Sequence, residues 1–407
     1  MRPLRTKRNQ ASFAIICPRA AMLPILLATI LTLSALYAPQ PLLPVITTEF
    51  QVSREAASLL TTITFLPLSL APLVYGVLLE KVSPRRLLQM TMALLALSEF
   101  LFAWTPLFSL LLAIRLFQGL LIPALLTSLM TYLAATTGRA QIQSKMAIYV
   151  AATITGGFLG RAMSGLIATL WGWRYSFLVL AVSLIISFLL LFRLPQTPPR
   201  QVQRPSFKAL WSVLQTPFCL YAYLMIFCLF LTFAAVMNFI PFRLTEVSHQ
   251  ADEFRIGLMY CGYLMGVVTS LLAVRIGHLL GRETRAILVG FAVLGLALIG
   301  FVVPLIPVLF LTMFVFCGGM FLVHSTTSGF LNRWTDAPNG VVNGLYVAFY
   351  YGGGVVGSFL PGYIYRDFGW NGFLASLFAI VLLGIVFAWK LHRASPADTS
   401  GPIMGKS

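Results

Sequence analysis

Four ionisable side chains stand inside long apolar stretches of this 407-residue sequence, where an unpaired charge is costly. They are Glu99, Arg115, Arg161 and His324. An imidazole or a carboxyl group can take up and release a proton, whereas a guanidinium can hold an anion with its fork of N–H donors. These residue types indicate a site for protons or a charged solute within an apolar body.

Glu99 and Arg115 are the first candidates for a pair. If their segments form a hairpin that turns near Leu107, each residue lies 8 positions from the turn. A helical rise of about 1.5 Å per residue then places both at a similar depth, and a paired carboxylate could serve as a proton site. Two alternatives stay open: Glu99 can reach toward the membrane surface, and Arg115 can be a structural arginine bonded to backbone carbonyls. His324 similarly suits either proton transfer or a hydrogen bond between helices.

The segments that carry these residues have the length and composition of transmembrane helices. The chain is 59% hydrophobic and only 10% charged, against about 25% charged in a typical soluble domain. Apolar runs of about 20 residues recur along it, and backbone groups in lipid must be satisfied within a helix. We predict an all-α polytopic membrane protein with about twelve spans. They cover roughly Met22–Leu43, Ala57–Leu79, Leu87–Ala103, Leu107–Leu133, Met146–Ile167, Tyr175–Phe192, Phe218–Pro241, Ile256–Ile276, Ala286–Val303, Ile306–Phe330, Val341–Ile364 and Phe373–Trp389.

The net charge of +17 is distributed as a membrane topology rather than as a nucleic-acid surface. When the loops are numbered alternately, one side collects most Lys and Arg residues together with both termini, which predicts that both termini are cytoplasmic. The largest break in hydropathy predicts a linker between two halves. The expected divisions are a tail 1–20, a first half 21–194, a linker 195–216, a second half 217–392 and a tail 393–407.

A repeated glycine pattern predicts that the two halves are structurally equivalent. The stretch Tyr149–Trp173 recurs as Tyr346–Trp370, always 197 positions later. Small residues allow close helix packing, and we expect these glycines to pack the fifth and eleventh helices against their symmetry mates across the halves. The glycines concerned are Gly156, Gly157, Gly160, Gly353, Gly354 and Gly357. Arg161 departs from the symmetry because its mate is Ser358, which favours a substrate or coupling role for the arginine.

Two six-helix halves joined by a linker resemble the major facilitator superfamily of secondary transporters over essentially the whole chain. A narrower resemblance, to bacterial inner-membrane efflux carriers of the YnfM type, rests on Gln40–Pro44, Gly156–Arg161, His324-Ser325 and Phe368–Gly372. The family resemblance implies a monomeric carrier with a central cavity between the halves. Helices that line that cavity contribute the expected substrate contacts Tyr37, Gln40 and Asn238, to which we add the aromatic residues Tyr346 and Tyr350.

Two further segments resemble signatures of that family. Arg115-Leu116-Phe117-Gln118-Gly119 matches R-x-x-Q-G, which implies a role for Arg115 in proton coupling and in contacts to the first and second spans. The loop from Gly76 to Arg86 resembles the cytoplasmic signature that locks one access state against the eleventh helix, here near Asn339–Asn343. Its expected gate residues are Gly76, Glu80, Arg85 and Arg86. Ser83-Pro84 stands where Gly-Arg is usual, so the turn of this loop departs from the pattern.

The resulting prediction is a secondary active transporter that moves a small organic solute by alternating access. Proton-coupled export, by antiport, of a drug, sugar or metabolite is favoured by the narrower resemblance, and proton-coupled uptake by symport is the alternative. Enzyme activity is not expected, because four histidines and one acid inside a span hardly supply a catalytic cluster. The five cysteines have no metal or redox spacing, so no metal and no cofactor beyond the proton gradient is expected. The expected partners are the solute, protons and the lipid bilayer, without nucleic acid.

Overall fold

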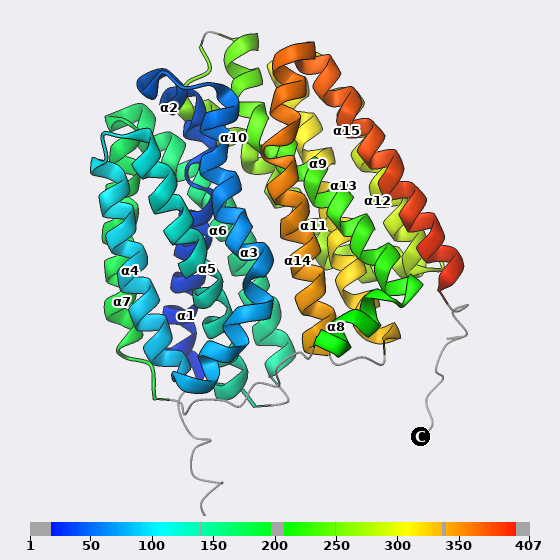
Figure 1. The fold of residues 1–407 in the computed structure, drawn as a ribbon, viewed down its shortest axis with the longest axis horizontal. Helices are drawn as coiled ribbons and strands as arrows, with labels where there is room; N and C mark the ends of the chain where they lie inside the picture. Colours follow the sequence, from blue (N-terminus) through cyan, green and yellow to red (C-terminus); the bar gives the residue numbers. More distant parts are fainter. Residues whose placement is uncertain (1–17, 139–140, 197–206, 249, 336–338, 396–407) are drawn as a thin grey trace, which may run out of the picture.

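The computed structural model describes residues 18–138, 141–196, 207–248, 250–335 and 339–395. The side chains of 18–21, 71–81, 143, 147, 207, 334 and 339 lie outside this description. All regular structure in the described ranges is helical, arranged as a bundle of long helices (Figure 1). We call the end of the bundle where α1 begins and α15 ends the terminal side, and the opposite end the distal side.

The first half of the chain forms six membrane-length elements. Its helices are α1 (Pro18–Tyr37), the short η1 (Gln40–Leu42) and α2 (Leu43–Phe50), then α3 (Arg54–Lys81), α4 (Pro84–Trp104), α5 (Phe108–Thr136), α6 (Ile142–Trp171) and α7 (Trp173–Leu191). The first element is interrupted at Pro39 and Pro41, because a proline cannot donate the backbone hydrogen bond that an α-helix requires. The break leaves the last carbonyls of α1 without helical partners, and Arg115 meets two of them, as described below.

The second half repeats this layout after α8 (Phe207–Leu214), a short helix within the expected linker. Its helices are α9 (Pro217–Val247), α10 (Glu253–Met259), η2 (Tyr260–Gly262), α11 (Tyr263–Leu279), α12 (Glu283–Gly300), α13 (Ile306–Trp334), α14 (Asn339–Gly357) and α15 (Leu360–Ala394). α15 turns sharply at Gly369, where φ is +67°. The turn therefore divides α15 into a short segment that follows α14 and a long segment that runs back to the terminal side (Figure 1).

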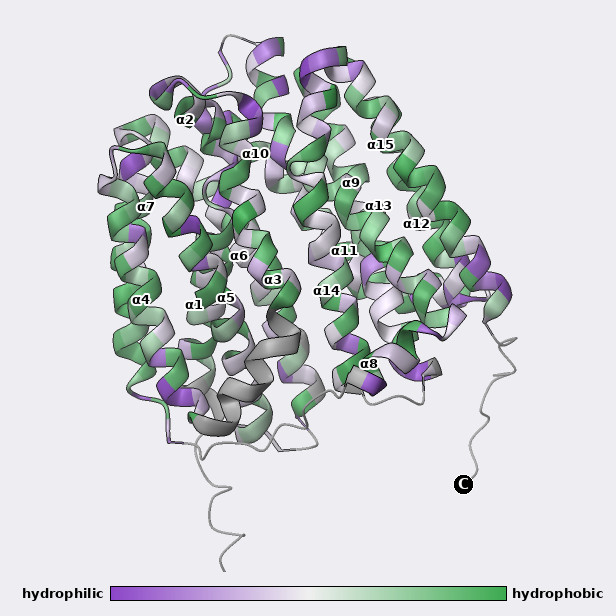
Figure 2. Cartoon of the chain, in the orientation of Figure 1, coloured by the Kyte–Doolittle hydropathy of each residue, from purple (hydrophilic) through white to green (hydrophobic). Residues whose placement is uncertain are grey.

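Ten helical stretches of the described residues are long and apolar enough to cross a membrane. The helices α3 and α14, of 28 and 19 residues, bring the membrane-length elements in this part of the chain to twelve. Figure 2 shows hydrophobic residues along the bodies of the helices and hydrophilic residues gathered near the two ends of the bundle. Large apolar side chains such as Leu271 and Leu296 are exposed on the outside, as expected for a surface that faces lipid.

The glycine repeat appears in three dimensions as two matching helix contacts. On α6, a Cβ at Gly156 would overlap the carbonyl of Ile30, and on α14 a Cβ at Gly353 would overlap that of Phe227. Ile30 and Phe227 are themselves 197 positions apart, so the partner helices α1 and α9 follow the same repeat. The glycines at Gly160 and Gly357 likewise meet α1 and α9.

These contacts correct the expectation that the glycine faces pack across the two halves. Gly156 and Gly160 bring α6 against α1 inside the first half, and their mates bring α14 against α9 inside the second. Gly354 differs, because a Cβ there would meet the rings of Phe230 and, from the first half, Phe65. Close approach of backbones within each half explains the pattern, since each half must hold its own helices together.

Candidate functional site

Arg161 lies on α6 at the boundary between the two halves and is 1% exposed. Its Nε donates to Oε1 of Gln40 at 2.6 Å, and its Nη1 donates to the carbonyl of Gly157 at 2.6 Å. The guanidinium carbon also lies 4.0 Å from the ring centre of Tyr37, 4.9 Å from Tyr260 and 4.6 Å from Tyr263. Such distances are those of cation–π contacts. No carboxylate of the described residues forms an ion pair with Arg161, so its charge is held by rings and dipoles.

From Arg161, a closed series of ring contacts runs around the boundary between the halves. In order, it connects Arg161, Tyr37, Phe65, Phe230, Tyr350, His324, Phe321 and Tyr263, which again touches Arg161. We call these eight residues the aromatic ring. They come from α1, α3 and α6 of the first half and α9, α11, α13 and α14 of the second. The ring therefore crosses the boundary between the halves twice.

Tyrosines in and beside the aromatic ring make further polar contacts. The side chains of Tyr37 and Tyr351 are hydrogen-bonded to each other, and that of Tyr263 is hydrogen-bonded to Arg161. Tyr350, Tyr351 and His324 are only half-buried, so part of this region remains accessible. Polar and partly accessible side chains deep in a membrane protein are the surroundings that a solute site requires.

His324 lies across the aromatic ring from Arg161, on α13. A 2.9 Å hydrogen bond joins its Nδ1 to Oη of Tyr346, and its ring lies 4.9 Å from that of Tyr350. His324 and Tyr350 are half-buried, whereas Tyr346 is buried. The structure thus brings three of the expected site residues into one cluster, with Tyr37, Gln40 and Arg161 forming a second cluster on the other side of the ring.

Arg115, on α5, is fully buried and has a different set of contacts. Nη1 and Nη2 donate to the carbonyls of Ala35 and Leu36 at 3.0 and 2.7 Å, and Nε donates to Leu60 at 2.8 Å. Nη1 also donates to Oε1 of Gln118 at 2.7 Å. Ala35 and Leu36 lie in the last turn of α1, whose carbonyls lack helical partners, and a cation there complements the helix dipole. Arg115 thus fastens the end of α1 and joins it to α3.

Glu99 does not form the ion pair with Arg115 that the depth argument made possible. Its carboxyl is fully buried, so it faces the interior of the bundle rather than lipid. Neither oxygen has a hydrogen-bond partner, and Nε2 of Gln118 is also enclosed without one. The Gln118 amide and the Arg115 charge both act electrostatically on the carboxyl. The ion pair does not form because backbone carbonyls at the end of α1 accept from Nη1 and Nη2 of Arg115. The equal depth of the two residues gave no information about this competing contact.

The sequence matches a known protein family along most of its length. A profile of the Major Facilitator Superfamily matches residues 25–328 and 222–406. The chain belongs to the major facilitator superfamily. Two bacterial relatives of this transporter are similar along most of their length: YybF of Bacillus subtilis, an uncharacterized transporter 25% identical over 368 residues, and YnfM of Escherichia coli, an inner membrane transport protein 24% identical over 381 residues. The matches cover 89% and 90% of this chain and 91% and 89% of the relatives.

Solved structures share the fold of this major facilitator protein. A bacterial homologue of the human lysosomal transporter Spinster matches with a TM-score of 0.75 at 13% identity, covering 92% of this chain and 96% of that one. The nucleoside transporter NupG matches with the same score and identity, covering 92% and 99%. Its membership of the family, together with this fold, makes the protein a polytopic membrane transporter of small solutes rather than an enzyme.

Asn238 is the expected substrate contact that the structure places elsewhere in the transporter. It is fully buried on α9, and its Nδ2 donates at 2.9 Å to the carbonyl of Ser358, at the break between α14 and α15. The hydroxyl of Ser358 bonds to that of Thr62 on α3 at 2.8 Å. Asn238 thus supports a helix break and a contact between the halves, away from the aromatic ring.

The expected terminal-side gate is described only in part, because for Gly76 and Glu80 the structure describes the backbone alone. Nη2 of Arg85 donates to the carbonyl of Phe192 at the end of α7, within the same half. Ser83 caps the start of α4 by accepting from the backbone N–H of Arg86 at 3.4 Å. A Ser followed by a Pro suits a helix start, which explains how this loop forms without the usual Gly-Arg.

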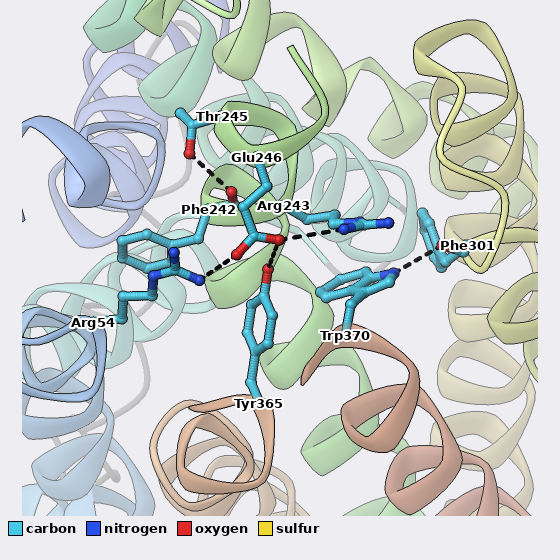
Figure 3. Close-up of polar contacts among 8 residues, drawn as sticks. All are labelled: Arg54, Phe242, Arg243, Thr245, Glu246, Phe301, Tyr365 and Trp370. Atoms are coloured by element: carbon cyan, nitrogen blue, oxygen red, sulfur yellow. Dashed lines mark hydrogen bonds and ion pairs between the residues drawn. The ribbon is translucent and has the colours of Figure 1, made fainter. Parts of the chain in front are cut away.

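A polar network joins the halves at the distal side (Figure 3). The carboxylate of Glu246, at the end of α9, accepts from Arg54 at the start of α3, from Tyr365 on α15 at 2.7 Å and from Arg243 at 3.3 Å. Arg54 also lies over the rings of Phe242 and Tyr365. A second contact lies nearby, where the backbone N–H of Phe254 donates to Thr169 of α6. These bonds hold the distal side closed.

Sequence reasoning missed the tyrosines of the eighth span, Tyr260 and Tyr263, which complete the surroundings of Arg161. The span was expected to be one continuous helix, but η2 interrupts it at Tyr260–Gly262. Three glycines at Gly257, Gly262 and Gly266 within one apolar run were an available signal of an irregular, closely packed element.

Proposed function

We propose that this transporter is a proton-coupled antiporter that exports a small organic solute from the bacterial cytoplasm. The observation that carries the proposal is Arg161, a buried guanidinium between the halves whose hydrogen-bond partners are all uncharged. A carrier needs such a polar, accessible site at the contact of two moving units. Export is supported by the likeness of Gln40–Pro44 and Gly156–Arg161 to YnfM-type efflux carriers. Proton-coupled uptake is the second candidate.

The moving units in this proposal are the halves 21–194 and 217–392, joined by the linker 195–216 and flanked by the tails 1–20 and 393–407. The conformation described here is closed at the distal side through Arg54 and Glu246. That pair must break for the solute to leave on this side. In the opposite state, the Gly76–Arg86 loop is proposed to close the terminal side, with Arg85 and Arg86 on the membrane surface.

Glu99 is proposed to carry the proton, with Gln118 and Arg115 as positioning residues. An enclosed carboxylate without hydrogen bonds bears a desolvation cost that protonation removes. Loss of the proton would draw the Gln118 amide toward the carboxylate and away from Arg115, because the new bond is charge-assisted. Arg115 holds the carbonyl of Leu36 at 2.7 Å, immediately before Tyr37 of the solute site. Proton release would thereby act on the solute site through the end of α1.

His324 is proposed as a second coupling group, on the other side of the aromatic ring. Protonation would change the hydrogen bond that its Nδ1 makes with Tyr346, since a doubly protonated ring can only donate. Tyr346 lies on α14, in the half opposite to Glu99. With one proton-binding group on each half, protonation could change the contacts of both moving units.

The orientation and location are also part of the proposal. Arg85, Arg193, Arg285 and Lys390 lie near the terminal side, so the preference of basic residues for the cytoplasm places both termini there. The inner membrane is supported by the similarity to YnfM, an inner membrane protein of another bacterium. A monomer suffices, because both faces of the proposed site come from one chain.

The test uses the purified protein in liposomes with a trapped pH dye, challenged with a panel of sugars, cationic dyes and organic acids. Antiport predicts that solute movement drives protons in the opposite direction, and symport predicts the same direction. In Glu99→Gln, solute exchange at equal pH should persist while solute-driven proton movement is lost. Unchanged proton movement in that variant would remove Glu99 from the mechanism, and the absence of exchange for every solute would contradict the carrier proposal.

A further inference from the structure

We propose that the solute is a singly charged organic anion with a flat apolar body, held by its carboxylate at Arg161 and by its body within the aromatic ring. The inference rests on the proposed carrier function and adds a substrate class to it. Two features of the described residues carry it: the missing counter-charge of Arg161 and the composition of the aromatic ring.

The charge of Arg161 calls for an anion. A buried guanidinium is normally paired or saturated with hydrogen bonds, because its removal from water is costly. Arg161 is 1% exposed, yet no carboxylate of the described residues pairs with it. Its partners are the Gln40 amide, the Gly157 carbonyl and the Tyr263 side chain, all of them uncharged. A solute carboxylate beside the guanidinium would supply the missing counter-charge.

The neighbours of Arg161 restrict the anion to a single charge. Tyr37, Tyr260 and Tyr263 surround the guanidinium, and Gln40 takes its Nε. All four are uncharged in their ordinary state. The other ionisable group of the aromatic ring, His324, is bonded to Tyr346 on the far side. A phosphate dianion or a dicarboxylate would leave one charge without a partner in these surroundings.

The body of the solute is specified by the remainder of the aromatic ring. Phe65, Phe230 and Phe321 are buried and form an apolar wall, and the half-buried Tyr350 stacks on Phe230 with ring centres 3.7 Å apart. Flat rings pack favourably against aromatic faces in stacked or edge-on arrangements. Tyr350 and Tyr351 are only half-buried, so their side chains are partly accessible to a solute with a polar substituent. An aromatic carboxylate meets all of these conditions.

The test compares two ligands of nearly the same shape, benzoate and benzamide, by their effect on the thermal unfolding midpoint of the full-length protein in detergent. Acetate and inorganic phosphate provide the arms without a ring and with a higher charge. We expect benzoate to raise the midpoint in a saturable way and the other three to have little effect. This comparison needs no mutation, so it holds even if a variant fails to fold.

Variants then locate the effect. Arg161→Gln should weaken benzoate binding by about ten- to a hundredfold, the value of a charge-assisted hydrogen bond. Arg161→Lys keeps the charge but loses the planar fork, so it should retain part of the affinity. Arg174→Gln is the matched control: Arg174 also lies over an aromatic ring, that of Trp173, but it is paired with Glu49 away from the site. Its affinity for benzoate should equal that of the unmutated protein.

Equal stabilisation by benzamide, or binding of acetate or phosphate as strong as that of benzoate, would overturn the proposal. So would full benzoate affinity in Arg161→Gln. Failure of the carrier function gives a different pattern, namely benzoate binding through Arg161 without exchange of labelled benzoate in liposomes. Proton-coupled exchange of neutral solutes, with no binding of benzoate, would support the carrier function and reject the anion.

Discussion

Arg115 and Arg161 are both arginines buried in the first half, but their surroundings differ in one decisive respect. The three guanidinium nitrogens of Arg115 all donate to protein, to carbonyls of α1 and α3 and to Gln118. Arg161 lies at the boundary between the halves among tyrosine rings, bonded to Gln40, Gly157 and Tyr263. The comparison indicates that an arginine held by carbonyls at a helix end supports the fold, whereas one placed between the moving halves can bind an anion.

The same difference separates neighbouring positions at the break in the first element. Arg115 holds Leu36 and thereby fixes where α1 ends, whereas Arg161 contacts Tyr37 and Gln40 just beyond that point. Structure and proposed binding thus meet at the proline break of one helix. A change at Arg115 can therefore affect the solute site, because Leu36, which Arg115 binds, directly precedes Tyr37.

The largest expected effect is on stability, in Arg115→Gln. The carbonyls of Ala35 and Leu36 would lose their donors, at about 1–3 kcal/mol for each buried group left unpaired. We expect a clear drop in the thermal unfolding midpoint and in the yield of folded protein. An unfolding midpoint equal to that of the unmutated protein would show that Arg115 does not fasten α1.

Arg161→Gln should have the opposite profile. Its removal takes the donor from Oε1 of Gln40 but leaves no carboxylate unpaired, so the unfolding midpoint should fall by less than in Arg115→Gln. Transport of the solute should fall at least about tenfold, the loss expected for one charge-assisted bond. Exchange of labelled solute in liposomes, scaled to folded protein, measures this. A large loss of stability with normal exchange would reverse the comparison between the two arginines.

Two glycines of α6, one turn apart and close to Arg161 in the sequence, sharpen the comparison further. A Cβ at Gly160 would lie 2.5 Å from the Cα of Ser34, so Gly160→Ala must push α6 away from α1. A Cβ at Gly157 would lie 3.5 Å from its nearest neighbours, an ordinary contact. We expect Gly160→Ala to cost about 1–3 kcal/mol of stability, as overpacking typically does, and Gly157→Ala to cost much less. Equal unfolding midpoints for the two variants would contradict the packing described for α6.

The smallest expected effect concerns the distal network. Glu246→Gln weakens a bond between the halves, and exposed pairs of this kind contribute about 0.2–1 kcal/mol, which amounts to a change of a few-fold at most in an access equilibrium. Glu49→Gln is the control, because Glu49 pairs with Arg174 inside the first half. The rate of solute exchange should change only in Glu246→Gln. Equal rates in both variants would remove the network from the gate.

The parts of this architecture that follow from backbone chemistry were predictable from the sequence. Helices are required in lipid, so hydropathy located the spans, and the 197-residue repeat located equivalent contacts such as Gly156 with Ile30 and Gly353 with Phe227. Gly172 and Gly369, which are also 197 positions apart, both adopt a positive φ. Gly172 lies at the turn after α6, and Gly369 lies at the turn within α15.

The partners of polar side chains were less predictable, because spacing gives the depth of a residue but not the rotation of its helix. With 3.6 residues per turn, a small rotation directs a side chain to another neighbour. Glu99 and Arg115 therefore shared a depth without pairing, and Asn238 met Ser358 instead of the solute site. Tyr260 and Tyr263 were not predicted as site residues, because the break in their span depends on packing, which the sequence pattern does not show.

The most direct measurement of the account is solute exchange per folded molecule in Arg115→Gln and Arg161→Gln, at equal pH on both sides of a liposome. The labelled solute is the one that the unmutated protein exchanges fastest in the panel. We predict that Arg115→Gln loses folded protein but keeps the larger part of its exchange per folded molecule, whereas Arg161→Gln folds and has lost at least about nine-tenths of its exchange, the tenfold effect of one charge-assisted bond. Normal exchange by folded Arg161→Gln would contradict the placement of the solute site between the halves.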